Sequence, residues 1–149
     1  FVIRAFLGAI AAEVPPSSWF MTSIFAGSLF VATRKRYAEK KLAHSGGIET
    51  RRVLNSYSLK VLSVGSQLLS ACFVLAYIAW CVEVNIGGSG ALTLRLVSAV
   101  PLCGAVIRYQ RQSEGEIGES PEDLLTEDRT MRIWGIFWTI AVGLSLYAG

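Results

Sequence analysis

Side chains that could bind phosphate are concentrated in one part of the sequence, between residues 34 and 60. This segment holds eight Lys and Arg residues, including Lys35, Arg36 and Lys40, with Tyr37 among them. Guanidinium and ammonium groups bind phosphate through charge-assisted hydrogen bonds, so the cluster is typical of a site for a phosphorylated substrate. A basic cluster beside a membrane can equally serve to attract anionic lipid headgroups. The residues alone favour neither interpretation.

A second polar segment, residues 110–130, is acidic. Seven of its residues are Asp or Glu, and most of these are expected to be solvated. Ser120 and Pro121 are followed by two acids, a pattern typical of a helix start. It predicts a short helix on the membrane surface that ends near Arg129.

Charged residues at the ends of apolar stretches, and inside one of them, are further candidates. Arg108 and Tyr109 end one stretch, and Asp128 and Arg129 precede the next. Arg4 lies within an apolar stretch, where a charge is costly and usually faces a cavity or a partner. Arg4 is therefore a candidate for function, with a structural ion pair as the alternative.

Other motifs of known chemistry do not occur in the sequence. The chain has one histidine, His44, and three scattered cysteines, so it contains no zinc-binding pattern. It also lacks a glycine-rich phosphate loop and a dinucleotide fingerprint. Cys72, Cys81 and Cys103 lie in or beside apolar stretches and are expected to act as small apolar residues.

Four long apolar stretches must position these polar groups: residues 19–33, 61–82, 92–109 and 131–148. Hydrophobic residues make up 52% of the 149-residue chain and charged residues 17%, against about 25% charged in a typical soluble domain. Each stretch is about long enough to cross a bilayer as a helix. The sequence therefore predicts an all-α, polytopic helical membrane bundle. It excludes a disordered chain and a disulfide scaffold.

The Lys and Arg residues alternate between the loops of this predicted bundle. Loops 13–18 and 83–91 contain none, the loop 34–60 contains eight, and the last loop contains three. The positive-inside rule places the two basic loops in the cytoplasm. This predicts a multi-pass protein of the cell membrane with its polar loops cytoplasmic and its C-terminus outside.

A fifth apolar stretch, residues 1–12, opens the chain. As a helix it would extend about 18 Å, against about 30 Å for the hydrocarbon core of a bilayer. No basic segment precedes it, unlike in a signal peptide. We therefore expect a truncated membrane helix here, and a chain that is part of a larger protein.

The order of these motifs resembles the C-terminal half of decaprenyl-phosphate phosphoribosyltransferases, within the UbiA superfamily of intramembrane prenyltransferases. The motifs are Phe1-Val2-Ile3-Arg4, Ser17-Ser18-Trp19-Phe20, Lys35-Arg36-Tyr37-Ala38-Glu39, Asn55-Ser56-Tyr57-Ser58, Arg108-Tyr109, Ser120-Pro121-Glu122-Asp123 and Asp128-Arg129. The resemblance covers the whole chain. It implies that residues 1–149 are helices five to nine of a nine-helix domain whose N-terminal portion is absent. An odd-numbered helix then runs from inside to outside, in agreement with the loop charges.

The resemblance implies a membrane glycosyltransferase. It would transfer a 5-phosphoribosyl group from phosphoribosyl diphosphate to a polyprenyl (decaprenyl) phosphate and release diphosphate, for arabinogalactan in a cell wall. Magnesium is implied as the cofactor, held mainly by an aspartate-rich motif of the absent portion. No metal ligand is therefore expected in this chain, and the chain alone is expected to be inactive. The implied partners are the two substrates, the membrane and the N-terminal half, with a homo-oligomer allowed and no nucleic acid.

The resemblance also implies roles for the candidate residues. Lys35, Arg36 and Lys40 would bind donor phosphate, and Tyr37 would help to position it. The remaining roles are a phosphate contact in the cavity for Arg4, the mouth of the site for Arg108 and Tyr109, and the covering loop for Asp128 and Arg129.

Two other functions stay open on the sequence. One is a UbiA-type prenyltransferase with a prenyl diphosphate donor, although Lys35-Arg36-Tyr37 stands where many of these proteins have a second aspartate motif. The other is a membrane scaffold or transporter fragment without enzymatic activity.

Overall fold

Helices make up all the regular structure in the part of the chain that the structure describes. The structure is a computed structural model that describes residues 3, 4, 7, 17–46, 58–83, 88–112 and 128–147. Its long helices are α2 (Ser18–Gly46), α3 (Leu59–Glu83), α4 (Gly88–Gln112) and α6 (Arg129–Tyr147). The all-α prediction is confirmed, and each long helix contains one of the four predicted apolar stretches, the last of them as far as Tyr147.

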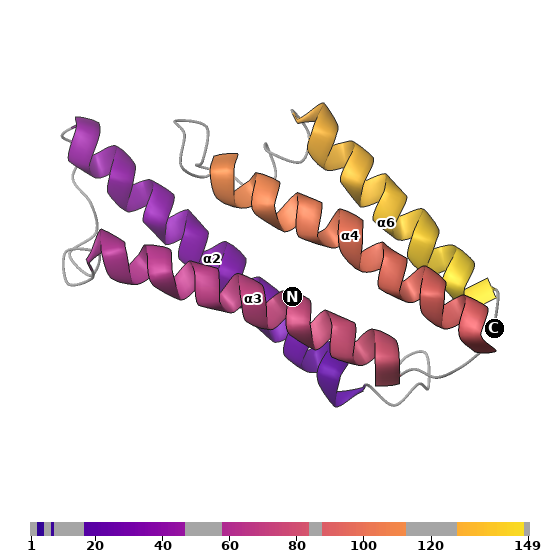
Figure 1. Ribbon diagram of the computed structural model, residues 1–149. Helices are drawn as coiled ribbons and strands as arrows, with labels where there is room; N and C mark the ends of the chain where they lie inside the picture. The colour runs from indigo at the N-terminus through magenta and orange to yellow at the C-terminus, as the bar shows by residue number, and fades with distance from the viewer. Residues whose placement is uncertain are drawn as a thin grey trace.

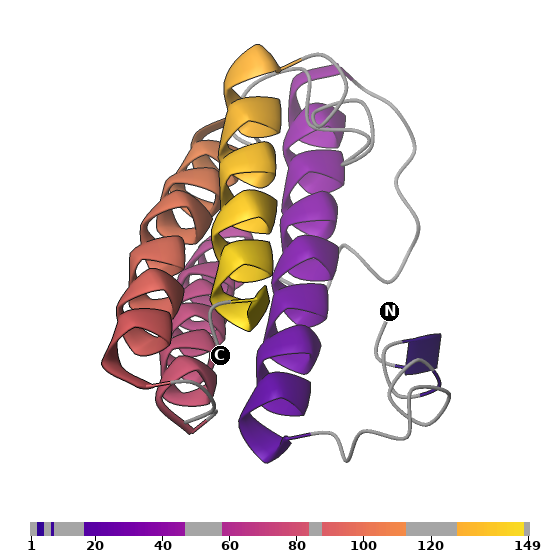
Figure 2. The ribbon, with the colours of Figure 1, turned by 90° about the vertical axis from the view of Figure 1, so that its right-hand side faces the viewer.

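The four helices run alternately in opposite directions and form two antiparallel pairs (Figure 1). Helix α2 packs along α3, α4 packs along α6, and α3 and α4 join the two pairs. The C-terminal end of α2 and the N-terminal end of α6 consequently lie at the same end of the bundle (Figure 2). The alternation of direction thus brings together polar residues that are far apart in the sequence.

Short polar residues determine where three of the helices begin. The Ser17 carbonyl accepts the first helical hydrogen bond of α2 from the Met21 amide, at 3.0 Å. In α3 the Ser58 carbonyl accepts the corresponding bond from the Leu62 amide, at 3.2 Å. In α6 the Asp128 carbonyl accepts it from the Arg132 amide. Such residues are preferred at this position because their side chains can also accept a bond from an exposed amide.

Two glycines let aromatic rings approach a neighbouring helix closely. A Cβ atom placed on Gly27 of α2 would lie 3.2 Å from the Phe73 ring of α3. A Cβ on Gly104 of α4 would lie 3.0 Å from the Trp134 ring of α6. In each antiparallel pair, an aromatic ring of one helix therefore packs directly against the backbone of the other at a glycine.

The interior of the bundle is richer in small polar residues than its outer face. Ser66, Ser98 and Ser145 are at most 1% exposed, and the hydroxyl of each donates a hydrogen bond to the carbonyl three residues earlier. A hydroxyl satisfied within its own helix can be buried at low cost, and its small size lets helices pack closely. By contrast, Leu68 is 67% exposed and Ile136 is 61% exposed. Large aliphatic side chains thus face outwards on α3, α4 and α6.

One buried polar contact joins three helices. The hydroxyl groups of Tyr77 on α3 and Ser98 on α4 lie 2.6 Å apart, and the Trp138 indole of α6 donates to the Tyr77 oxygen at 3.0 Å. Buried polar groups of this kind are costly unless each one has a partner. Here the three partners satisfy one another, so the contact fixes how α3, α4 and α6 sit side by side.

Two stretches of the described residues are long and apolar enough to cross a membrane, Leu59–Glu83 and Leu92–Gln112. We predicted four membrane-spanning helices. Within the described ranges, α2 and α6 do not meet the same criterion of length and apolar character. In α2 the apolar residues give way at Arg34, and the helix continues for about 20 Å to Gly46. The helix therefore extends beyond the apolar stretch and through the first part of the basic segment.

Other predicted features lie outside the described residues. They are most of the surface helix predicted from Ser120 and most of the opening apolar stretch. Arg129, predicted to end the surface helix, is the first residue of α6.

The close packing at Gly104 gives a first prediction. Replacing Gly104 by Leu should lower the free energy of unfolding by about 2 kcal/mol, because the added side chain must displace the Trp134 ring. Gly143 on α6 is a matched control, since a Cβ there would meet nothing within 4 Å. Thermal unfolding of the two variants in detergent measures the difference. Equal midpoints for Gly104→Leu and Gly143→Leu would contradict the packing described here.

Candidate functional site

One end of the bundle is strongly cationic. The C-terminal ends of α2 and α4 and the N-terminal ends of α3 and α6 lie at this end (Figure 1). Among the described residues, ten Lys and Arg belong to this basic end: Arg34, Lys35, Arg36, Lys40, Lys41, Lys60, Arg108, Arg111, Arg129 and Arg132. The acids described there are Glu39 and Asp128. This excess of positive charge favours binding of a polyanion.

The basic segment of α2 presents part of its charge to solvent. Lys35 and Arg36 are exposed, Tyr37 is half-buried, and Lys40 is buried. A nitrogen of Arg36 lies 2.7 Å from the Glu39 carboxylate, one helical turn away. Exposed ion pairs of this kind contribute little to stability and exchange readily with other partners. Lys35 and Arg36, which are neighbours in the chain, and Lys41 are therefore the cations of this segment that an incoming phosphate can reach.

Arg34, one residue earlier, behaves differently from its neighbours. Its side chain is 2% exposed. One guanidinium nitrogen donates a hydrogen bond of 2.6 Å to the Gln110 carbonyl of α4. Its guanidinium carbon also lies 5.4 Å from the centre of the Tyr37 ring, within the range of a cation–π contact. We did not single out Arg34 from the sequence, where it is one cation among eight.

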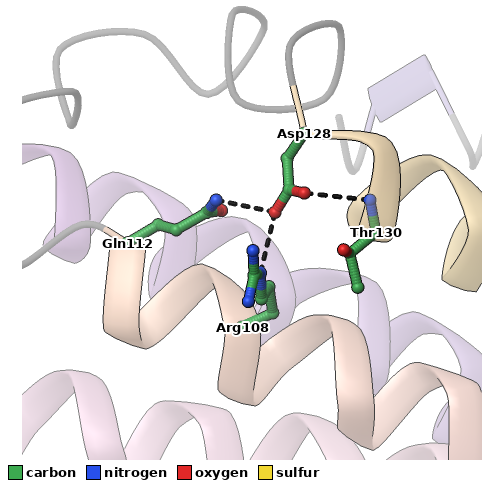
Figure 3. A network of polar contacts seen from close by, with 4 residues as sticks. All are labelled: Arg108, Gln112, Asp128 and Thr130. Carbon is green, nitrogen blue, oxygen red and sulfur yellow. Dashed lines mark hydrogen bonds and ion pairs between the residues drawn. The ribbon is translucent and has the colours of Figure 1, made fainter.

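Asp128 joins the end of α4 to the start of α6 (Figure 3). One carboxylate oxygen accepts hydrogen bonds from Arg108 Nε at 2.8 Å and from Gln112 Nε2 at 2.6 Å. The other oxygen caps α6 by accepting from the Thr130 amide at 2.9 Å. The bond from Arg108, followed by those from Thr130 and Gln112, lowers the pKa of Asp128 to about 2. The structure thus brings together Arg108 and Asp128, two of the predicted residues, and adds Gln112.

The other predicted residues are placed separately. Tyr109 is buried in an apolar cluster, with its ring centre 5.6 Å from that of Phe30 on α2. It therefore packs α4 against α2. Arg129 is exposed at the first position of α6, and Arg4 is exposed on a helical turn described at residues 3, 4 and 7. The roles given to Arg4, Tyr109 and Arg129 stay predictions.

The described residues do not form a metal site. In these ranges no three His, Cys, Asp or Glu side chains lie close enough together to hold an ion. Glu39 and Asp128 are both engaged by arginines. The charged side chains described at the basic end are therefore mostly cations, which suit an anionic ligand.

The described structure is thus a helical bundle, apolar outside, with an anion-attracting end. Over its full length, the chain is homologous to the C-terminal 48% or so of decaprenyl-phosphate phosphoribosyltransferases. It is 34% identical over 149 residues to the one from Mycobacterium tuberculosis and 32% identical over 154 residues to the one from Mycolicibacterium smegmatis.

A third relative of the same name, from Corynebacterium glutamicum, is 28% identical over 147 residues. The matches cover 99% to 100% of this chain but 44% to 48% of the relatives, so the chain spans about half their length. No protein-family model matches the chain. The homology predicted from the motifs is confirmed.

The low pKa of Asp128 gives a second prediction. Because the folded pKa lies below the usual value of about 4, the contact stabilises the protein above pH 4 and is lost as the pH falls towards 2. Between pH 5 and pH 8 the contribution of this contact to stability should not change. The carboxyl carbon signal of Asp128, followed by NMR, should titrate near pH 2. In Arg108→Ala the titration should move up towards pH 4, because the largest cause of the shift is removed while the bonds from Thr130 and Gln112 remain, and in Arg111→Ala it should stay near pH 2. Titration near pH 4 in the unaltered protein would contradict the contact.

Proposed function

We propose that this chain is the phosphate-binding half of a membrane-embedded phosphoribosyltransferase. The reaction would join phosphoribosyl diphosphate to a polyprenyl phosphate lipid and release diphosphate. The relatives' name supplies the reaction. The observation in the structure that supports it is the gathering of ten cations at one end of a bundle whose outer face is aliphatic.

A membrane location for the bundle is supported by where its apolar side chains lie. Exposed aliphatic residues follow one another along α3, α4 and α6: Val61, Val64, Leu68, Leu75, Val82, Leu96, Val97, Val100, Ile107, Ile133, Ile136, Ile140 and Leu144. Water-soluble monomers rarely expose continuous apolar patches of such extent. Lipid tails or further helices would cover them, and small buried serines are typical of helix contacts inside a bilayer. The basic end would then lie on the cytoplasmic side.

The chemistry asks for charge neutralisation and positioning. A phosphate oxygen of the lipid would attack the anomeric carbon of the donor, forming a new C–O bond. The bond from that carbon to the diphosphate oxygen would break, and diphosphate would leave with the electron pair. Negative charge grows on the leaving group as the ring becomes cationic, so fixed cations that contact the diphosphate lower the barrier.

In this proposal Lys35 and Arg36 contact donor phosphate, because they are adjacent exposed cations of the α2 segment. Arg36 would exchange its contact with Glu39 for the ligand. The Arg108–Asp128 contact would hold the ends of α4 and α6 in place beside the site. Magnesium stays a prediction, and no step here depends on it, since the described residues offer it no ligand set.

Loss of the Arg36 charge gives a third prediction. In the complete gene product, Arg36→Ala should lower kcat/KM for phosphoribosyl transfer roughly 10- to 100-fold, the usual effect of removing a charge-assisted contact. Lys60→Ala is the control, because Lys60 is an exposed cation at the same end on a different helix, α3. Labelled phosphoribosyl diphosphate and membranes containing each variant provide the assay, with membrane abundance measured alongside.

Three results would count against this proposal. Full activity in Arg36→Ala would exclude Arg36 from the donor site. Equal losses in Arg36→Ala and Lys60→Ala would mean that only net charge matters. Labelled lipid formed from a prenyl diphosphate and not from phosphoribosyl diphosphate would favour a prenyltransferase instead.

A further inference from the structure

We infer that Arg34 is a positioning residue that anchors the donor-binding turn of α2 to the C-terminal end of α4. Its effect on catalysis rests on the proposed function, whereas the anchor itself does not. Arg34 directly precedes Lys35 and Arg36 in the helix, so whatever holds Arg34 also limits where those two side chains can point.

The partner of Arg34 suits a buried cation. Helix α4 ends at Gln112, so the Gln110 carbonyl is one of the last four, which have no amide donor within their own helix. These carbonyls also carry the negative end of the helix dipole. The 2.6 Å hydrogen bond from Arg34 therefore places the guanidinium at the negative end of this dipole, and this partly compensates the cost of burying its charge.

The same end of α4 is tied to the other helices of the bundle. The Gln110 side chain donates a 2.7 Å hydrogen bond to the Ser70 hydroxyl of α3. Arg108, half a turn earlier, holds Asp128 at the start of α6. The end of α4 is therefore held by contacts with α3 and α6. By donating a hydrogen bond to the Gln110 carbonyl, Arg34 fixes the position of the α2 segment relative to this end.

The burial of Arg34 separates its role from that of its neighbours. Lys35 and Arg36 are exposed and can meet a ligand, whereas Arg34 is 2% exposed and directed at protein atoms. An apolar side chain would fill this place without the cost of desolvating a charge. The guanidinium instead restricts the orientation of the side chain, through its hydrogen bond to the Gln110 carbonyl and its contact with the Tyr37 ring.

The kinetic test uses Arg34→Met and Arg34→Lys in the complete gene product. Arg34→Met keeps most of the side-chain length without a donor and should raise the KM for phosphoribosyl diphosphate roughly tenfold. Arg34→Lys keeps a donor but lacks the planar group, so its KM should rise about two- to threefold. The KM for the lipid phosphate should stay unchanged in both. Arg132→Met, the same exchange at an exposed arginine of α6, removes the same charge from the basic end and should raise the KM for phosphoribosyl diphosphate less than Arg34→Met does.

A distance measurement tests the anchor without relying on activity. Spin labels at Lys41 and Arg111, in a background lacking the exposed Cys72, report the separation of the α2 and α4 ends. The distance distribution should broaden in Arg34→Met, less in Arg34→Lys, and not in Arg132→Met.

The outcomes separate the inference from the proposed function. Unchanged donor KM and an unchanged distribution in Arg34→Met would overturn the inference. If Arg34→Met gives no folded protein, the test rests on Arg34→Lys. A donor KM and a distance distribution equal to those of the wild type in Arg34→Lys would then overturn the inference. Equal rises in the KM values of both substrates would also overturn it, since that indicates general damage. If the wild type transfers no phosphoribosyl group, the proposed function fails, and the distance distribution alone decides the anchor.

Discussion

A bundle with an aliphatic outer face must satisfy its buried polar groups from within, because neither lipid nor an apolar neighbour can do so. The described helices meet this constraint in two ways. Buried serines such as Ser66 bond to the carbonyl one turn earlier, and Tyr77 shares its hydroxyl with Ser98 and Trp138 across three helices. The helix contacts can then be made from small residues, while the large aliphatic side chains face outwards.

The same constraint explains why the charges gather where the helices end. Carbonyls at the end of α4 and amides at the start of α6 lack partners within their helices, so charged side chains are stabilised beside them. Arg34 bonds a carbonyl of α4, and Asp128 bonds an amide of α6 while holding Arg108. These contacts fix the framework of the basic end. The exposed Lys35 and Arg36 remain accessible to a phosphate.

The helices were predictable from the sequence because apolar length and helix-start residues act locally. Ser17 and Ser58 precede α2 and α3 as their types suggest. The contacts within the site were harder to foresee. The Arg34–Gln110 bond joins residues 76 apart, and nothing local distinguishes a buried arginine from the exposed Lys35 beside it. Tyr109 was predicted at the mouth of the site, and its ring packs against Phe30. This contact depends on how α2 packs against α4, which the sequence around Tyr109 does not reveal.

The proposed function requires that this bundle cross a membrane with its basic end on the cytoplasmic side. Single cysteines placed at Lys41 and at Glu83, at opposite ends of the bundle, test it most directly in the complete gene product. The label is a maleimide that cannot cross membranes, applied to intact cells and to inverted vesicles. The account predicts that Glu83→Cys reacts only in cells and Lys41→Cys only in inverted vesicles. Labelling of both positions from the same side would contradict it.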